Sequence, residues 1–237
     1  MPATDELPIY LKVRNDVRTR ISSGAYPAGT AIPSENDLAE LYGTTRLTVR
    51  NAIDALVDEG LIRRVQGKGA FSAGSLAIQR GEIPQGFREQ TEHDLHVPGV
   101  RILETRLRAA GPRYASLFSM GEDDDLYMVR RLNSVDGEPY SVETTYIPRA
   151  LFPGITEVDI SVFSLYETYA FLGHKVTRVH ELIDLAELSA NEAHLLHVKA
   201  CGPAMVLDCM SYDANGTPVE HAVSLTRGDL GSYSVRY

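Results

Sequence analysis

The sequence predicts an α+β protein of two domains, a short helical domain followed by a longer domain built on an antiparallel sheet. The chain has 237 residues, which is enough for two domains that each bury a core. Residues 1–75 carry apolar residues at helical spacing, whereas residues 87–237 are dominated by strand-like stretches separated by turns. We place a linker at residues 76–86, where Gly, Ser and Pro interrupt the periodicity.

Composition limits the class of protein. Apolar residues make up 43% of the chain and charged residues 23%, and no apolar run approaches the ~20 residues of a membrane span. The first residues contain neither a basic leader nor an apolar secretion segment, so we expect a cytoplasmic protein without a membrane partner. The two cysteines, Cys201 and Cys209, lack the spacing of a metal site, and we expect neither a metal nor a cofactor.

Charge is unevenly distributed between the two parts. Residues 1–75 hold nine basic and nine acidic residues, whereas residues 76–237 hold the whole net charge of −9. A neutral domain with clustered arginines, tethered to an acidic domain, is typical of a nucleic-acid reader joined to a module that avoids nucleic acid.

The first domain is predicted to contain three helices. Apolar residues spaced by two to four over Ile9–Ile21 predict the first helix, which ends at Gly24. Ser34 begins the second, because its hydroxyl can accept from the backbone N–H of Asp37, whose carboxylate suits the positive helix end. Gly43 ends the second helix, and the third begins only two residues later.

The third helix carries its charges in the order that opposes its dipole. Its inward side is defined by apolar residues at spacings of 3, 4, 7 and 8, namely Val49, Ala52, Ile53, Leu56 and Val57. Arg46 and Arg50 lie near its N-terminus and acidic residues near its C-terminus, which costs about 0.3–1 kcal/mol per exposed charge. A solvated charged face is the plain alternative. A helix that inserts its first turn among phosphates has a physical reason for this polarity.

A short β-hairpin follows the third helix. In LIRRVQGKGAF, residues 61–71, β-branched residues alternate with Arg63, Arg64 and Gln66 before a Gly-Lys-Gly turn centred on Lys68. Such a turn alone is weak evidence for phosphate binding. Three helices with a two-residue link before the third, followed by a basic hairpin, predict a winged helix-turn-helix.

The physical roles on DNA follow from the side chains. Arg46 or Arg50 is the expected base reader, because a guanidinium group can pair with guanine O6 and N7. Thr48 and Ser34 suit phosphate, as do Lys68 and the wing backbone. With no net positive charge in one copy, a monomer would bind weakly, so we expect a homodimer on two half-sites of double-stranded DNA.

These stretches are similar to a known family. PIYLKVRNDVRTRI and PSENDLAELYGTTRLTVRNAIDALVDEGLIRRVQGKGAF resemble the DNA-binding domain of the GntR family of bacterial transcription regulators, over nearly all of residues 8–72. The resemblance implies operator contacts from the start of the second helix, the first turn of the third and the wing tip. On this chain the matching positions are Ser34, Arg46, Thr48, Arg50, Gln66, Lys68 and Gly69. Family members often carry Arg where this chain has Asn36, so that contact is altered or absent.

The second domain is predicted to be α+β with an antiparallel sheet. The strand-like stretches are residues 100–109, 125–135, 140–147, 175–185, 204–213 and 219–227. The helix candidates are residues 113–119, 161–173 and 189–197, the last with Ser189 as its cap.

Two hairpins of this domain resemble each other. LNSVDGEPYSVETTYIP and MSYDANGTPVEHAVSLT each place a strand, an Asp-Gly or Asn-Gly turn, a proline and a second strand with an internal glutamate, Glu143 or Glu220. A carboxylate among apolar neighbours must find a partner, and a salt bridge to a nearby arginine is one alternative. Two inward glutamates with Arg130 and Arg131 on an adjoining strand predict instead a polar pocket at the centre of the sheet.

From residue 87 onward the chain resembles the ligand-sensing UTRA domain of the HutC subgroup of GntR regulators. VRRLNSVDGEPYSVETTYIP, SVFSLYETY, SANEAHLLHV and SYDANGTPVEHAVSLTRGD carry the resemblance. It implies a chorismate-lyase-like fold and an effector pocket closed by Phe87 and its loop. The implied pocket residues are Arg131, Glu143, Ser164, Tyr166 and Glu220.

Two departures bear on the effector. Members that respond to sugar phosphates tend to carry an Arg and a Tyr where this chain has Asn133 and Thr226. A doubly ionised phosphate would lose a charge-assisted partner, which favours a phosphate-free or singly charged effector, although Arg130 could compensate.

We therefore predict a dimeric DNA-binding transcription regulator, a repressor released from its operator by a small-molecule effector. The alternatives are a DNA-binding scaffold without a ligand and a lyase-like enzyme in which Glu143, Glu220 and Arg131 act on a small acid. The sequence holds no GxSxG, HExxH or P-loop, so we assign no catalytic residue. His194 and His197 have helical spacing, but a partly exposed helix face explains them better than a metal.

Overall fold

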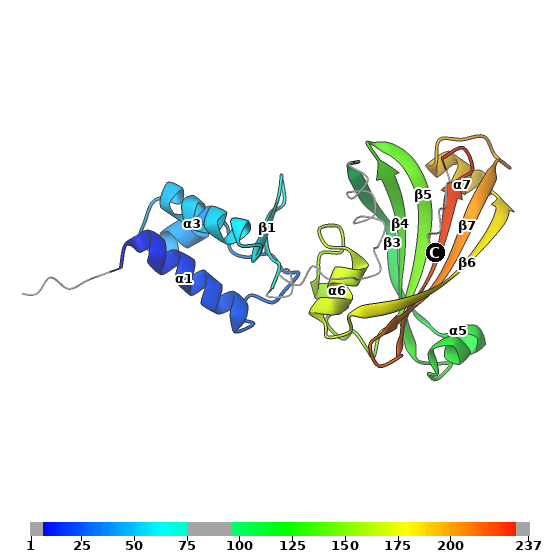
Figure 1. The fold of residues 1–237 in the computed structure, drawn as a ribbon, viewed down its shortest axis with the longest axis horizontal. Coiled ribbons are helices and arrows are strands. Elements are labelled where there is room, and N and C mark those ends of the chain that lie inside the picture. Colours follow the sequence, from blue (N-terminus) through cyan, green and yellow to red (C-terminus); the bar gives the residue numbers. More distant parts are fainter. Residues whose placement is uncertain (1–6, 75–95, 231–237) are drawn as a thin grey trace, which may run out of the picture. The chain divides into compact units, whose positions relative to one another are not determined.

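The computed structural model describes residues 7–74 and 96–230 of the chain (Figure 1). They form two compact units. Of the described residues, the first unit groups 7–74 with Thr156–Phe163, and the second holds 96–155 and 164–230. The predicted linker at residues 76–86 lies outside the described residues, so the domain boundaries stay a prediction.

The first unit contains the predicted three helices and wing. Its elements are α1 (Ile9–Ser22), α2 (Glu35–Leu41), α3 (Arg46–Asp58), β1 (Ile62–Val65) and β2 (Gly69–Ser72). Gly24 and Gly43, which follow α1 and α2, have φ angles of 78° and 59°. These left-handed conformations let the chain leave each helix sharply, and glycine adopts them without steric cost.

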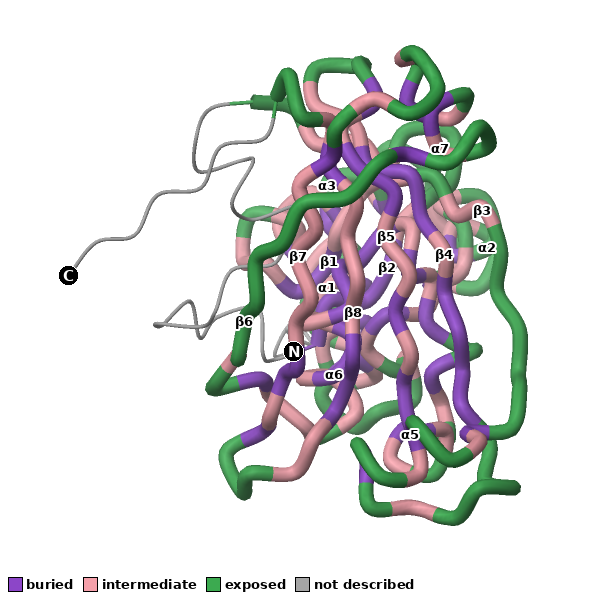
Figure 2. Tube along the Cα trace, turned by 90° about the vertical axis from the view of Figure 1, so that its right-hand side faces the viewer, coloured by how far each residue is buried: buried purple, intermediate pink, exposed green. Residues whose placement is uncertain are grey.

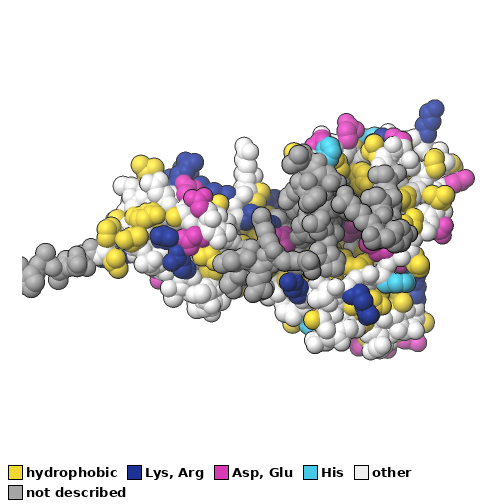
Figure 3. Space-filling view, in the orientation of Figure 1, with side chains coloured by type: hydrophobic (Ala, Val, Ile, Leu, Met, Phe, Trp, Pro, Cys, Tyr) yellow, Lys and Arg dark blue, Asp and Glu magenta, His cyan; other side chains and the backbone are white. Residues whose placement is uncertain are grey.

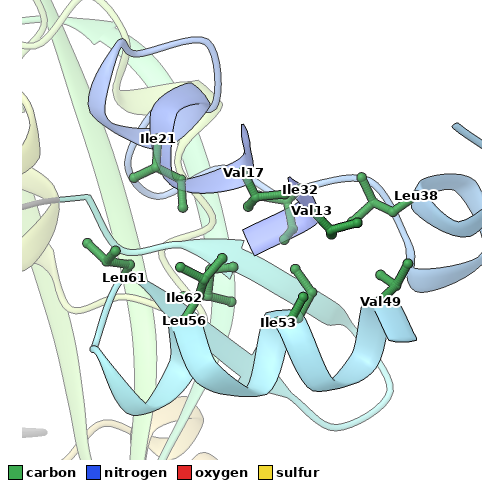
Figure 4. Packing of buried hydrophobic residues seen from close by; sticks show 11 residues of the cluster. Val13, Val17, Ile21, Ile32, Leu38, Val49, Ile53, Leu56, Leu61 and Ile62 are labelled. Atoms are coloured by element: carbon green, nitrogen blue, oxygen red, sulfur yellow. The ribbon is translucent and has the colours of Figure 1, made fainter. Parts of the chain in front are cut away.

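The core of the first unit lies between α1, α2 and α3. Val49, Ile53 and Leu56 of α3 point toward Val17 of α1 and Leu38 of α2, and all five are at most 1% exposed (Figure 4). Burying an aliphatic side chain of this size stabilises a fold by about 1.5–3 kcal/mol. This packing fixes which side of α3 is directed away from the unit.

The second unit is built on a six-stranded antiparallel sheet in the order β3-β4-β5-β8-β7-β6. Its strands are β3 (Pro98–Ala109), β4 (Asp125–Val135), β5 (Glu138–Pro148), β6 (Val176–Glu187), β7 (Pro203–Asp213) and β8 (Pro218–Arg227). All six strands predicted from the sequence are present, and the α+β class is confirmed.

The strand order reveals a repeat longer than the two similar hairpins. A strand, a helix and a hairpin occur twice, as β3-α5-β4-β5 and as β6-α7-β7-β8, and the two copies meet where β5 pairs with β8. Helices α5 (Gly111–Phe118) and α7 (Ala190–Leu195) lie at opposite ends of the sheet (Figure 1). The turn η2 (Ile155–Glu157) and helix α6 (Leu165–Phe171) connect the copies. Among the described residues, no helix has the length and apolar character needed to cross a membrane.

The two faces of the sheet are covered differently. Tyr114 of α5 lies 5.8 Å from the ring of His221, and Val142 packs in the apolar cluster of α7, so both helices cover one face. Side chains alternate along a strand, so Glu143 and Glu220 lie on the opposite face. There Tyr169 of α6 contacts Glu220.

Candidate DNA-binding and effector sites

The start of α2 is held by a reciprocal cap. The Ser34 hydroxyl accepts from the backbone N–H of Asp37 at 3.2 Å and donates to Asp37 Oδ2 at 2.7 Å, as its sequence predicts. Asn36 is exposed beside it. A phosphate contact from the Ser34 hydroxyl would have to replace its bond to Asp37.

The first turn of α3 presents cations to solvent. Thr45 caps the helix by accepting from the N–H of Thr48 at 3.2 Å. The Arg46 side chain is 66% exposed, and its Nε donates to Glu35 Oε2 at 2.9 Å. The Arg50 side chain is exposed and makes no hydrogen bond or ion pair with the described residues. Arg50 is therefore available to a ligand without breaking a contact of the folded chain.

Glu35 links α3 to the hairpin of β1 and β2. Besides Arg46, its carboxylate pairs with Arg64 of β1 at 2.9 Å, and Arg64 also reaches Asp54 of α3 at 3.1 Å. Basic and acidic side chains accordingly lie interspersed on the first unit (Figure 3). Exposed pairs of this kind are weak, so DNA phosphates can compete for these arginines.

The acidic end of α3 has a structural explanation that the sequence analysis missed. Glu59 accepts from Arg14 Nε at 3.0 Å and from Arg18 Nη2 at 2.5 Å, both on α1. The hydrogen bond from Arg14 lowers the pKa of Glu59, and Arg18 adds to the effect. Glu59 at the C-terminal end of the helix is therefore explained by its bonds to α1. Of the reversed charge order, only the arginines at the N-terminal end remain as evidence for DNA binding.

The wing tip holds the remaining predicted DNA contacts. Gln66, Lys68 and Gly69 are exposed, and Gly69 has a φ of 109° that suits glycine. Within the first unit, Lys68 Nζ lies 3.3 Å from Asp159 Oδ2. A phosphate contact from Lys68 would replace this ion pair.

In the second unit, Arg131 and Glu143 form a buried ion pair across β4 and β5. They are register partners, Arg131 Nη2 donates to Glu143 Oε1, and the side chains are 11% and 13% exposed. Burial alone would lower the pKa of Arg131, but the Glu143 carboxylate raises it overall. Burial by itself would raise the pKa of Glu143. The charge of Arg131 and its hydrogen bond outweigh this effect, so the pKa of Glu143 is lowered overall. Both groups are therefore charged at neutral pH.

Glu220 of β8 lies on the same face and forms no ion pair with any residue that the structure describes. It is 3% exposed and accepts from Tyr169 at 2.6 Å and from Ser211 at 3.0 Å. The Tyr166 hydroxyl lies 3.0 Å from that of Ser211. Burial, assisted by the charge of Glu143 and opposed by the hydrogen bond from Tyr169, raises the pKa of Glu220 to about 7. This carboxyl group can change protonation near neutral pH.

Two buried polar atoms of this face have no partner in the described parts of the chain. They are Nε of Arg131 and Oδ1 of Asn133, whose amide nitrogen donates to Ser141 at 3.2 Å. An unsatisfied buried polar group costs about 1–3 kcal/mol, so such atoms mark a place where a bound group gains hydrogen bonds. The name polar sheet cluster is used below for Arg131, Asn133, Glu143, Tyr169, Ser211 and Glu220.

Two family models match the chain. Residues 9–71 match the model of bacterial regulatory proteins of the gntR family, and residues 94–230 match that of the UTRA domain. The chain is a GntR-family regulator with a UTRA domain. The combination predicted from the sequence is confirmed.

Individual relatives agree over nearly the whole length of this GntR regulator. It is 27% identical to the HTH-type transcriptional repressor NagR of Bacillus subtilis, over 94% of this chain and 92% of that protein. It is 29% identical to the HTH-type transcriptional regulator GmuR of the same organism, over 93% and 94%. The crystal structure of PhnF from Mycobacterium smegmatis superposes with a TM-score of 0.62 at 26% identity, covering 95% of this chain and 99% of that one. These relatives give no support to the lyase-like alternative.

In the GntR regulator, the structure brings together four of the eight residues predicted for the effector site and places Tyr166 beside them. The four are Arg131, Asn133, Glu143 and Glu220. It does not bring Arg130 to this cluster, since Arg130 lies on the opposite face, with Nη2 3.9 Å from Glu192 Oε1 of α7. Alternation along β4 is the reason, because consecutive residues point to opposite faces. The suggestion that Arg130 compensates for the missing arginine is therefore wrong.

The structure gives one of the two remaining predicted residues a capping role. The Ser164 hydroxyl caps α6 by accepting from the N–H of Glu167 at 3.1 Å. Phe87 lies outside the described residues. Tyr169 and Ser211 were missed, although both contact Glu220 directly. Ser211 could have been found from the hairpin, because it is the register partner of Glu220.

Proposed function

We propose that this GntR regulator is a repressor that binds operator DNA through α3 and its wing and is released when a small molecule binds the polar sheet cluster. The exposed, uncommitted Arg50 at the start of α3 is the observation that carries the DNA half of the proposal. The unpartnered Arg131 and Asn133 atoms support the effector half. The name of the relative NagR, a transcriptional repressor, supports the sign of regulation. Acting on an operator, the protein would work in the cytoplasm.

We also propose that it acts as a homodimer through the second unit. The edge strand β6 is exposed along most of its length (Figure 2). Leu182, Ile183 and Leu185 on it are 60%, 48% and 79% exposed. A long exposed edge strand that carries apolar side chains can pair with another chain, and a second copy would also supply the second DNA-binding unit. The effector need only bind one arrangement of the dimer better than the other.

The DNA-binding half is tested with Arg50→Ala. The probe is a duplex selected by the wild-type chain from a random-sequence pool, and affinity is measured by fluorescence anisotropy. Loss of one charge-assisted contact in each half-site, each worth about 1.5–3 kcal/mol, should weaken binding by roughly 10- to 150-fold per half-site. Arg101→Ala is the matched control, because Arg101 is an exposed arginine on β3. Equal affinities of Arg50→Ala and wild type would contradict the assignment.

The effector half is tested by thermal-shift screening of the full chain. The panel contains sugars, sugar phosphates, amino acids and small carboxylic acids, and compounds that raise Tm are then tested for release of the selected duplex. A ligand at 100 times its Kd adds about 2.7 kcal/mol of stability. The response should be lost in Glu220→Gln and retained in Glu104→Gln, an exposed glutamate on β3. A hit that stabilises Glu220→Gln equally would place the effector elsewhere.

A further inference from the structure

A segment from the second half of the sequence packs on the hairpin of the first unit. Thr156–Phe163, called the clasp segment below, follows β5 in the chain but belongs to the first unit. Arg63 of β1 donates from Nη1 to the Val162 carbonyl at 3.0 Å, and its guanidinium group lies 4.6 Å from the centroid of the Phe163 ring. That ring also packs edge-on against Phe71 of β2, with 6.4 Å between centroids. The clasp segment is therefore held by both strands of the wing.

The clasp segment presents an anion to the wing tip. Asp159 Oδ2 lies 3.3 Å from Lys68 Nζ, which also donates to the Ser161 hydroxyl. Asp159 is itself held by Ser161, whose backbone N–H and hydroxyl both donate to its Oδ1. Burial by itself would raise the pKa of Asp159, but the hydrogen bonds from Ser161 and Lys68 outweigh it and the pKa is lowered. The carboxylate is therefore charged at neutral pH and fixed beside Lys68.

This arrangement offers Lys68 the same chemistry as a DNA phosphate. A phosphate presents anionic oxygens to an ammonium group, and a carboxylate beside a hydroxyl oxygen presents a similar set. Lys68 could hold both anions only if a phosphate came next to the Asp159 carboxylate, and like charges at that distance repel each other. Lys68 is therefore bound either by the clasp segment or by the DNA backbone.

The chain joins the clasp segment directly to a helix of the proposed effector site. Ser164, the residue after Phe163, caps α6 by accepting from the N–H of Glu167 at 3.1 Å. Tyr169 of the same helix donates to Glu220 of the polar sheet cluster at 2.6 Å. A ligand that displaces α6 thus acts on a helix that follows the clasp segment without a linker.

We propose that the clasp segment is an autoinhibitory element, in which Asp159 and Ser161 hold Lys68 in place of a DNA phosphate until the wing binds DNA. The proposal rests on the proposed binding of DNA by α3 and the wing, and it names what restrains that binding. An effector that favours the state in which Lys68 is held would weaken binding to the operator. Because the pair is partly exposed, the restraint adjusts affinity and does not abolish binding.

The test is a double-mutant cycle on the full-length protein, with the selected duplex as probe and fluorescence anisotropy as readout. Asp159→Asn removes the anion that competes for Lys68, so it should tighten binding by about two- to fivefold per half-site. In a Lys68→Ala background the same change should have no effect, because the side chain that it releases is absent. A gain due only to the loss of negative charge near DNA would persist in that background.

Two further variants complete the design. Ser161→Ala removes a hydroxyl that contacts both Lys68 and Asp159 without changing the charge, and it should tighten binding only when Lys68 is present. It serves in place of Asp159→Asn should that protein not fold by circular dichroism. Glu157→Gln is the matched control, because it removes an exposed negative charge from the same segment. Its affinity should equal that of the wild type.

The outcomes separate this inference from the proposed function. If Asp159→Asn and Ser161→Ala bind the duplex like the wild type, or if their gain persists without Lys68, the clasp is overturned while DNA binding stands. The same holds if Glu157→Gln tightens binding as much as Asp159→Asn. If the wild type selects no duplex at all, the proposed function fails and the inference with it.

Discussion

The exposed first turn of α3 and the polar sheet cluster both gather polar side chains, but they hold them in opposite ways. On α3, the Arg50 side chain is exposed and makes no hydrogen bond or ion pair with the described residues, and the exposed Arg46 side chain pairs with Glu35. In the sheet, Arg131 and Glu143 are buried, and each stabilises the charged form of the other. Removing a group from α3 should therefore change binding and leave stability intact, whereas removing one from the cluster should change both. The predictions below test this difference, starting with the largest expected effect.

The ion pair of the sheet should be the most sensitive point. Glu143→Ala leaves the buried Arg131 charge without its partner, which should lower the free energy of unfolding of the second unit by roughly 3–5 kcal/mol. Urea unfolding followed by circular dichroism measures the loss, and hydrogen exchange of β4 and β5 locates it. Glu104→Ala removes a glutamate from a solvent-exposed pair on β3 and is the control. Equal urea midpoints for the two variants would mean that the ion pair does not contribute to the stability of the second unit.

This prediction changes how an effector test should be designed. A Glu143→Ala variant that fails to respond to an effector would not distinguish a lost ligand contact from a weakened sheet. Glu220→Gln preserves the shape of the side chain, removes its charge and replaces one of the two oxygens that accept from Tyr169 and Ser211 by an amide donor, but it leaves no unpaired buried charge. It is therefore the cleaner probe of binding.

Glu220 should make stability depend on pH. Its pKa is raised from the usual 4.5 to about 7, so between these values the folded state binds more protons than the unfolded state. The contribution of Glu220 to the free energy of unfolding is therefore greatest below pH 4.5 and decreases as the pH rises through about 7. The total decrease is roughly 3 kcal/mol. Melting of wild type and Glu220→Gln at pH 5 and pH 8 measures it. The difference between the two proteins should shift with pH, and an unchanged difference would show that Glu220 titrates normally.

The cap of α2 should contribute least. Ser34→Ala removes the acceptor for the N–H of Asp37 and should lower the stability of the first unit by about 1 kcal/mol. Ser23→Ala is the control, since Ser23 follows α1 and its hydroxyl donates to the Arg20 carbonyl at 3.3 Å, its one side-chain bond to the described residues. Hydrogen exchange of α2 amides reports the change. If operator affinity falls more steeply than stability, Ser34 also contacts DNA as predicted from the family.

The sequence predicted the elements better than the contacts between them. Apolar spacing was sufficient for α3 because Val49, Ile53 and Leu56 face the core in the way a helix of that period requires. The caps at Ser34 and Ser189 were predictable because each bond spans only three residues. Contacts between distant segments were not.

Long-range partners account for two of the errors. Glu59 bonds to Arg14 and Arg18, more than forty positions earlier, and no local pattern records that pairing. Tyr169 reaches Glu220 across 51 positions, and the sequence of α6 does not say which of its tyrosines does so. The misplacement of Arg130 was avoidable, since alternation along a strand separates it from Arg131.

The pairing of β5 with β8, where the two structural copies of the second unit meet, has a mechanical consequence. These strands pair over Ser141–Tyr146, a shorter run than the Glu138–Pro148 pairing of β5 with β4. Arg131 and Glu143 belong to one copy, and Ser211 and Glu220 to the other. A molecule bound among these residues would hold the two copies together across the shortest strand pairing of the sheet. Hydrogen exchange of the amides that pair β5 with β8 should then slow more than exchange elsewhere in the sheet.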